Sequence, residues 1–428
     1  MAYTETKSVG WGSRLGSSFR GMGFGILLVL AGTALLWWNE GNFVATGDAL
    51  NEAQGVTQEL GDIGTLNTAA NGKLVHASGF ADTRDTLVDP VFKISSRAIR
   101  LERAVQVYQW VEKTSTKRQK KVGGGEETVT TYTYEKEWVG KPVESSRFKA
   151  PNGAAMYANT VRMPLEKMTV QAATVSFGAY RLPEPLIRSI SGATAFEVAV
   201  PEDVLAQLNQ RLAPKVVAPQ PVPVVQETQA AADGQQAEPA VPVVVAAPVV
   251  HMVHASSNTV YVGINPSQPA IGDVRVTFME VRPATVSILA RLNGNTFEAY
   301  RASNNKTVFK LSMGTQSMEN MYGASHSSNS ASTWLFRVVA VVLVVMGLRM
   351  VVAPLSVAAD VIPFLGTLVG AGTGIVCLLL GLSWSFVVMA LAWLRFRPLM
   401  GGMALAAAAT LLVVLYMKGR SGKKAAQQ

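Results

Sequence analysis

The chain has 428 residues, of which 49% are hydrophobic and 16% are charged, and its formal net charge is +9. A basic balance can indicate nucleic-acid binding, but here the basic residues flank hydrophobic segments, as they do at cytoplasmic membrane borders. These residues are Arg14, Arg20, Lys418, Arg420, Lys423 and Lys424. We therefore expect a lipid bilayer and no nucleic acid as partner. The single cysteine, Cys377, excludes an intramolecular disulfide, so any exposed domain must fold by core packing alone.

The first apolar run, residues 21–38, predicts a transmembrane helix. Its length suits a hydrocarbon core of about 30 Å, which about 17–25 helical residues cross. Trp37 and Trp38 end the run where interfacial aromatic residues are typical, and no small-residue cleavage site follows them. The run is thus an anchor and not a cleaved signal peptide. The basic flank places residues 1–20 in the cytoplasm and the following domain outside it.

Residues 39–333 have the character of a soluble, β-rich α+β domain. Alternating polar and apolar residues at 98–112 and 128–138 predict one long β-hairpin. The basic hairpin tip at 117–121 suggests either a lipid headgroup or acidic partner, or simply a solvated loop. Residues 214–250 consist mostly of Pro, Val, Ala and Gln, and this composition predicts a disordered insert.

Three further apolar runs, at 334–352, 363–393 and 398–417, predict C-terminal transmembrane helices before a basic cytoplasmic tail at 418–428. The predicted fold class is therefore an α+β membrane protein with four transmembrane helices, one N-terminal and three C-terminal. The run at 363–393 would exceed roughly 40 Å as one helix, so it must tilt or kink. A re-entrant segment there is the alternative, and the topology of the last two helices stays open.

Small and basic residues in these runs are the candidate interaction sites. Gly366, Gly370, Gly374 and Gly381 lie on one helix face, a spacing that lets helix backbones approach within the bundle or between protomers. Trp334, Arg337, Arg349 and Arg397 are candidate membrane-interface or partner-contact residues. The arginines are expected to snorkel to the interfaces, or alternatively to act inside the bundle or a pore.

No catalytic pattern emerges from the motifs of the chain. His251 and His254 form an HxxH pair without an evident third metal ligand. Glu135 and Glu137 share one face of the predicted hairpin, where a solvated strand face competes with acid–base chemistry. We therefore expect no catalytic, metal or cofactor site and no enzymatic activity.

Short motifs in order along the chain resemble the LUMA family, also called transmembrane protein 43. They include Asn39-Glu40-Gly41, Gly72-Lys73-Leu74-Val75-His76, Tyr108-Gln109-Trp110-Val111-Glu112, Gly272-Asp273, Thr333-Trp334 with Arg337, Met346-Gly347-Leu348 and Arg397-Pro398-Leu399. The resemblance covers nearly the whole chain except the Pro/Ala-rich insert.

The resemblance implies an anchor helix, a large lumenal-type domain and three C-terminal helices. Its eukaryotic members are multipass scaffolds of the endoplasmic reticulum and inner nuclear membrane that self-associate. The composition of the insert suggests a bacterial member of the family. Such a member would lie in the inner membrane, with residues 39–333 in the periplasm. The nuclear partners of eukaryotic members therefore do not carry over to this chain. The expected function is a non-enzymatic, homo-oligomeric scaffold that organises membrane protein complexes, with envelope maintenance as one role. One alternative is a channel or transporter component in which Arg337, Arg349 or Asp360 lines a polar path. The other is a periplasmic ligand sensor or uncharacterised enzyme.

Overall fold

The computed structural model describes residues 2–149, 153–212, 251–399 and 401–403. The insert predicted at 214–250, most of the predicted fourth span at 398–417 and the tail at 418–428 lie outside these residues. Among the described residues, three helices are long and apolar enough to cross a membrane, one near the N-terminus and two in the C-terminal part. Together with the sheets below, they confirm a mixed α and β membrane protein with a β-rich domain.

The three membrane helices are α1 (Trp11–Val56), α5 (Met318–Ala359) and α6 (Pro363–Phe396). At 1.5 Å per residue the 46 residues of α1 extend about 69 Å, more than twice the hydrocarbon thickness. Its apolar run covers only residues 21–38, so the rest of α1 continues into the domain as a stalk. The polar first part of α5 lies beside this stalk, and Ser317 caps it by accepting a hydrogen bond from the Asn320 amide at 3.2 Å.

Glycines let the apolar parts of α1 and α5 touch backbone to backbone. A Cβ added to Gly25 would lie 2.7 Å from the carbonyl oxygen of Gly347, and one added to Gly347 would lie 2.6 Å from that of Gly25. Gly32 is similarly close to the carbonyl oxygen of Ala340, at 2.8 Å. Such approach permits the dispersion contacts that hold helices together in lipid.

We expect Gly25→Val to destabilise the helix pair by about 1–3 kcal/mol, because the added methyls meet backbone atoms that cannot move aside. Gly23→Val is the matched control on the same helix, since a Cβ at Gly23 meets nothing within 4 Å. Thermal unfolding of the full chain in detergent measures both variants. Equal loss of stability in the two would show that valine itself, and not the close contact, is responsible.

The domain contains two large sheets. The first has the order β1-β7-β6-β14-β13-β12, with β8 on β6 and β11 on β14, and the second has the order β19-β15-β16-β10-β9-β3-β2 with β15 also on β3. The strands of the first sheet are β1 (Ala2–Val9), β6 (Arg100–Lys120), β7 (Glu126–Val139), β8 (Met168–Gln171), β11 (Thr194–Ala195), β12 (Val253–Ser256), β13 (Thr259–Val262) and β14 (Val274–Val281). The strands of the second sheet are β2 (Gln58–Glu59), β3 (Leu74–Asp82), β9 (Ser176–Phe177), β10 (Tyr180–Arg181), β15 (Ala284–Asn293), β16 (Thr296–Glu298) and β19 (Lys310–Met313). Two small ribbons pair β4 (Leu87–Val88) with β5 (Ser95–Ser96) and β17 (Tyr300–Arg301) with β18 (Thr307–Val308). The short helices are η1 (Thr68–Ala70), η2 (Ser145–Arg147), α2 (Gly153–Met156), α3 (Glu184–Ser189) and α4 (Glu202–Leu212).

The domain core consists of two clusters of buried apolar side chains, and along some of its strands buried positions alternate with more exposed ones. In β14, for example, Val274, Val276 and Phe278 are fully buried, as the period of two predicts. One buried ion pair crosses this core, with Arg103 Nη1 2.6 Å from Asp89 Oδ2. A separate cluster around Leu50 and Tyr322 joins the stalks of α1 and α5 to the second sheet.

The predicted hairpin is confirmed as β6 and β7, which pair from Val107↔Val139 to Lys120↔Glu126. The outer half of the hairpin leaves the domain and is joined by β1, which pairs with β7 from Ala2↔Thr133 to Val9↔Glu126. We call this three-stranded ribbon, residues 2–9, 111–120 and 126–135, the arm. Because hydrogen-bonded strands share one compartment, residues 2–9 and the outer hairpin lie on the same side of the membrane. The prediction that residues 1–20 are cytoplasmic while residues 39–333 lie outside the cytoplasm would separate these paired strands, so its two parts cannot both hold.

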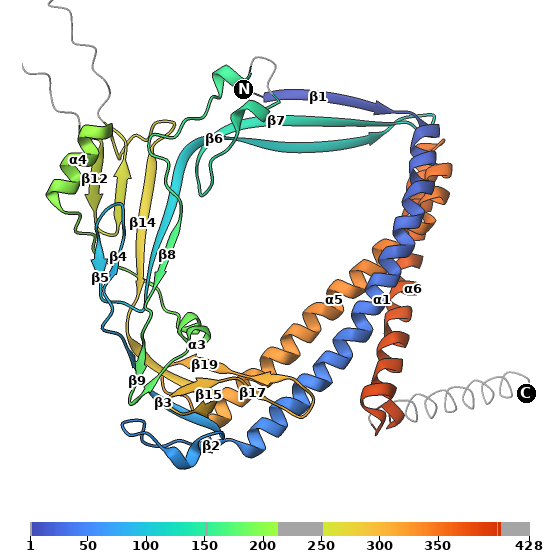
Figure 1. The fold of residues 1–428 in the computed structure, drawn as a ribbon. Helices are drawn as coiled ribbons and strands as arrows, with labels where there is room; N and C mark the ends of the chain where they lie inside the picture. Colours follow the sequence, from blue (N-terminus) through green and yellow to red (C-terminus); the bar gives the residue numbers. More distant parts are fainter. Residues whose placement is uncertain (1, 150–152, 213–250, 400, 404–428) are drawn as a thin grey trace, which may run out of the picture.

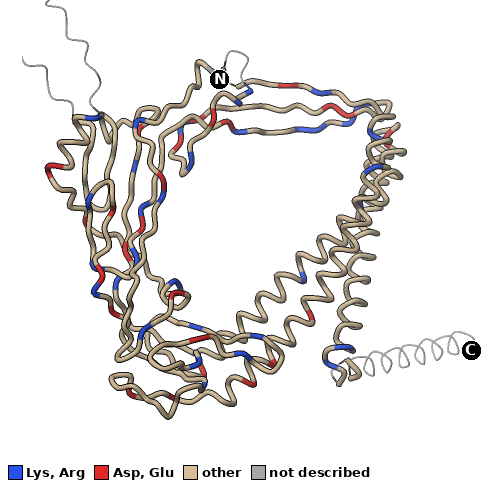
Figure 2. Tube along the Cα trace, in the orientation of Figure 1, with Lys and Arg blue, Asp and Glu red and all other residues tan. Residues whose placement is uncertain are grey.

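The molecule forms a closed frame with three sides. The membrane helices make one side, the two sheets make the second, and the arm bridges from the first sheet to the far end of the helices (Figure 1). Lys, Arg, Asp and Glu recur along the arm and the domain but are sparse along the middle of the helices (Figure 2). The arm therefore needs water or lipid headgroups around it, because hydrocarbon cannot satisfy the open edges of a sheet.

Candidate functional site

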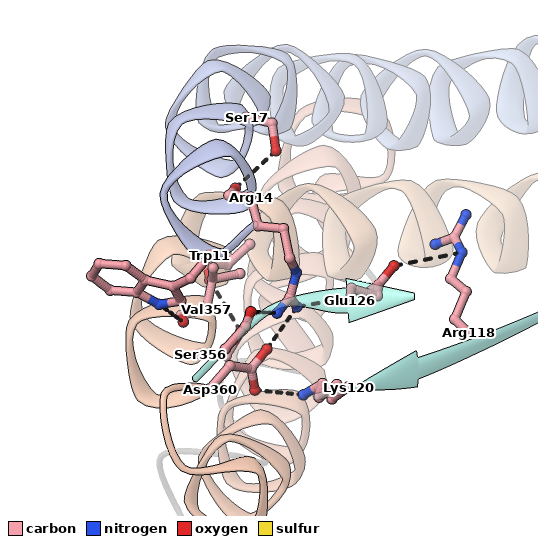
Figure 3. A network of polar contacts seen from close by, with 11 residues as sticks. Trp11, Arg14, Ser17, Arg118, Lys120, Glu126, Ser356, Val357 and Asp360 are labelled. Atoms are coloured by element: carbon pink, nitrogen blue, oxygen red, sulfur yellow. Dashed lines mark hydrogen bonds and ion pairs between the residues drawn. The ribbon is translucent and has the colours of Figure 1, made fainter. Parts of the chain in front are cut away.

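Two clusters of buried charge close the frame, one at each end of the apolar helix segments. The arm latch, defined as Arg14, Lys120, Glu126 and Asp360, joins the arm to α1 and to the end of α5 (Figure 3). The base latch, defined as Glu40, Arg337 and Trp393, joins the three helices at their other end. Arg14 and Glu40 are separated by roughly 39 Å along α1, a distance greater than the thickness of about 30 Å of a bilayer core.

Asp360 is the centre of the arm latch. It directly follows α5 and is only 1% exposed, so its charge depends on protein partners. Its Oδ2 accepts from Arg14 Nη2 at 2.7 Å and its Oδ1 from Lys120 Nζ at 2.6 Å, so both carboxylate oxygens are occupied. Glu126 Oε2 lies 3.5 Å from the same Arg14 nitrogen. The latch therefore links elements that are hundreds of residues apart in sequence.

The turn at the tip of the arm fits closely against the helix ends. Trp11 Nε1 donates to the carbonyl oxygen of Val357 at 2.9 Å, and the Gly123 amide donates to that of Val361 at 3.1 Å. Gly124 has φ +77°, and a Cβ there would lie 2.3 Å from Trp11 Cδ1. The glycine-rich tip is thus required both by the backbone conformation of the turn and by the indole beneath it.

The base latch is a buried bidentate ion pair. Glu40 is 1% exposed and accepts from Arg337 Nε at 2.6 Å and Nη2 at 2.7 Å. Trp393 Nε1 donates to Glu40 Oε2 at 2.9 Å, which adds α6 to the contact between α1 and α5. The guanidinium of Arg337 also lies 4.8 Å from the ring centroid of Trp334, a cation–π contact.

The four predicted glycines of α6 have different surroundings. An added Cβ would lie 1.8 Å from Asp360 Oδ1 at Gly366 and 2.5 Å from Val345 Cγ2 at Gly381. At Gly374 it would lie 3.5 Å from Arg349 Nη2, and at Gly370 it would meet nothing within 4 Å. Gly366 and Gly381 therefore pack tightly within the chain, Gly374 borders the Arg349 side chain, and Gly370 borders open space.

The predicted arginines and tryptophan are dispersed along the bundle. Trp334 and Arg337 line an apolar groove of about 640 Å³ between α5 and α6. Arg349 lies further along α5, in a separate cleft of about 480 Å³ that also includes Lys120. Arg397 lies over the ring of Phe43 at 4.9 Å, so it contacts α1. The structure brings Trp334 and Arg337 together but places Arg349 and Arg397 elsewhere.

The paired carboxylates of the hairpin, Glu135 and Glu137, both form ion pairs with Lys113 across the arm. The hydrogen bonds from Lys113 to Glu135 and Glu137 raise the pKa of that lysine above its ordinary value. The ion pairs with Lys113 therefore explain Glu135 and Glu137 as members of a charged face of the strand. Within the described ranges, no group of three or more His, Cys, Asp and Glu side chains could hold a metal ion.

Sequence reasoning missed Arg14 and Glu40 as partners of later residues. The sequence does contain a signal for ion pairs between helices. Each apolar run carries a charged residue at its border, and the charges on different runs have opposite signs. The sequence points to Asp360 only as part of a polar path and to Lys120 only as part of a basic hairpin tip. Nothing in the sequence specified which charge would meet which.

A family model described as Transmembrane protein 43 matches residues 107–398. Transmembrane protein 43 of Mus musculus is 26% identical over 406 residues, covering 92% of this chain and 89% of the mouse protein. That of Homo sapiens is 25% identical over 400 residues, covering 91% and 88%. The Transmembrane protein 43 homolog of Drosophila melanogaster is 26% identical over 399 residues, covering 90% and 92%. No solved structure matches.

Proposed function

The chain belongs to the transmembrane protein 43 family, and from this premise we propose that it is a non-enzymatic integral membrane scaffold that self-associates and organises membrane protein complexes. The observation that carries the proposal is the closed frame. The arm latch and the base latch bind the domain to both ends of the helix bundle. A domain held in this way keeps a fixed position relative to the bilayer, which is the property that a scaffold needs.

The channel hypothesis is weakened by the same ion pairs. It assigned Arg337, Arg349 and Asp360 to a polar path, but Arg337 pairs with Glu40 and Asp360 pairs with Arg14 and Lys120. Neutralised charges at the two ends of a packed bundle support a structural role for these residues.

The sensor or enzyme hypothesis would need a shaped polar pocket in the domain. A depression of about 950 Å³ there is lined by Arg100, Arg181 and Arg188 among others. Arg100 donates to the carbonyl oxygens of residues in and after α3, and Arg181 donates to that of Ala173. These contacts hold loops in place, so the arginines already have a structural use.

The proposed location is a bacterial inner membrane, with the domain in the periplasm. The basic residues before the run at 21–38 support this orientation. The pairing of β1 with β7 counts against one part of this orientation, because it places residues 2–9 beside the arm and so in the compartment of the domain, and not in the cytoplasm as the basic flank predicts.

Self-association is the part of the proposal that is most directly measured. Two populations of the full chain, each labelled with one of two fluorophores, are reconstituted together into liposomes and diluted with lipid. We expect energy transfer that persists on dilution and falls when unlabelled protein is added in excess. Energy transfer that falls in proportion to the dilution would show that the chain is a monomer, and it would overturn the proposal of a self-associating scaffold.

A further inference from the structure

Arg349 is a cation in the apolar part of α5, and its environment differs from that of the charged residues in the two latches. Its side chain is exposed, and no acidic side chain in the described part of the chain forms an ion pair with it. A charge in this position is costly in hydrocarbon unless it reaches water or meets an opposite charge. Its counterion should therefore come from outside the described residues.

The cleft beside Arg349 is suited to an anion. It has a volume of about 480 Å³ and lies between α5 and α6, with Lys120 of the arm at one end. Three hydroxyl-bearing residues also line it, namely Ser356, Thr367 and Thr373. Two cations and several hydroxyls around one space are the side-chain types that bind phosphate oxygens.

The glycines of α6 keep this space open. Gly366 and Gly370 line the cleft, and a Cβ at Gly370 would meet nothing within 4 Å. A Cβ at Gly374 would come within 3.5 Å of the Arg349 guanidinium. The predicted glycine face thus serves partly to make room beside a charge, and only partly to bring helices together.

The charge balance of the cleft is positive. Lys120 pairs with Asp360, whose two oxygens are already occupied by Lys120 and Arg14. Arg349 therefore adds an uncompensated positive charge. The cleft lies between membrane helices. Along α5, Arg349 is about 16 Å from Asp360 at the end of the helix. The long arginine side chain can snorkel toward that end, so its charge lies closer to the interface than its backbone does.

We propose that this cleft binds the phosphate group of an anionic phospholipid, with Arg349 and Lys120 as its cationic contacts. The acyl chains would follow the exposed apolar surface of α5 and α6. Because Lys120 also holds Asp360, the bound headgroup would sit directly against the arm latch. This inference is independent of the scaffold role proposed above.

The test uses the full chain in detergent and native mass spectrometry of its bound lipid. Phosphatidylglycerol, zwitterionic phosphatidylcholine and inorganic phosphate are each titrated at equal concentrations. We expect one phosphatidylglycerol to be retained at concentrations where phosphatidylcholine and inorganic phosphate are not. Equal retention of the two lipids, or binding of inorganic phosphate that displaces the lipid, would overturn the proposal.

Two variants probe the cleft in different ways. Arg349→Gln removes the charge, and Gly370→Leu places a side chain in the cleft at a position where an added Cβ meets nothing within 4 Å, so each is expected to weaken phosphatidylglycerol binding at least tenfold. Arg188→Gln is the matched control, because it removes an exposed arginine of the domain, and it should bind as the wild type does. Thermal unfolding verifies that the variants are folded. Unchanged binding in either folded cleft variant would place the lipid elsewhere.

Discussion

Glu40→Ala is expected to lower the free energy of unfolding by about 3–5 kcal/mol, because it leaves the Arg337 guanidinium buried without its counterion. The lost contacts are the two hydrogen bonds at 2.6 and 2.7 Å and the bond from Trp393 at 2.9 Å. All three helices contribute to this cluster, so its loss should loosen the whole bundle. Equilibrium unfolding of the full chain in mixed micelles measures the change.

Two further variants separate the ion pair from general effects. Glu40→Ala combined with Arg337→Ala removes both charges, and it should recover part of the stability because no unpaired charge remains. Glu184→Ala breaks an exposed pair with Arg188, and such surface pairs contribute about 0–1 kcal/mol. If Glu40→Ala were no more harmful than Glu184→Ala, the base latch would not stabilise the bundle.

Asp360→Ala is expected to release the tip of the arm at a cost of about 2–3 kcal/mol, a value below that for Glu40 because Lys120 remains partly in solvent. Arg14 and Lys120 would then face each other without the carboxylate that joins them. The readout is the distance distribution between spin labels at Val122 and Leu355, both of which are exposed, in a Cys377→Ser background. We expect a narrow distribution in the parent and a broad, longer one in the variant.

The control for this experiment lies on the arm itself. Lys113→Gln breaks an exposed charge cluster with Glu135 and Glu137 but leaves the tip contacts in place. Its distance distribution should match that of the parent protein. A narrow distribution retained in Asp360→Ala would mean that the tip is held by Trp11 and the backbone bonds of the turn, and not by the charges.

The local patterns in the sequence predicted much of the fold. Alternation identified β6 and β7, and the length of apolar runs identified the hydrophobic cores of α1, α5 and α6. The strand β1 was not predicted, although Tyr3 and the threonines beside it favour a strand, because the segment was interpreted only as a flank of the first membrane helix. Its partner, Thr133 to Glu126, lies more than one hundred residues away, where no periodicity can point to it.

The two latches also could not be predicted from local sequence patterns. Arg337 was expected to reach the interface alone, since snorkelling is the solution available to an arginine considered by itself. The structure gives it Glu40, a partner 297 residues earlier. Charge at the end of an apolar run is a local signal, but the choice of counterion depends on which helices become neighbours. That choice follows from the glycine contacts between α1 and α5, such as Gly25 with Gly347.

The pairing of β1 with β7 has a consequence for synthesis. Ala2 emerges from the ribosome long before its partner Thr133, and at about 5–20 residues per second the interval is roughly 7–26 s. During this time the first membrane helix has already left the ribosome, while β1 still waits as an unpaired strand. The arm can form once the hairpin has been made, but the arm latch must wait for Asp360 at the end of α5, so the frame closes only late in synthesis.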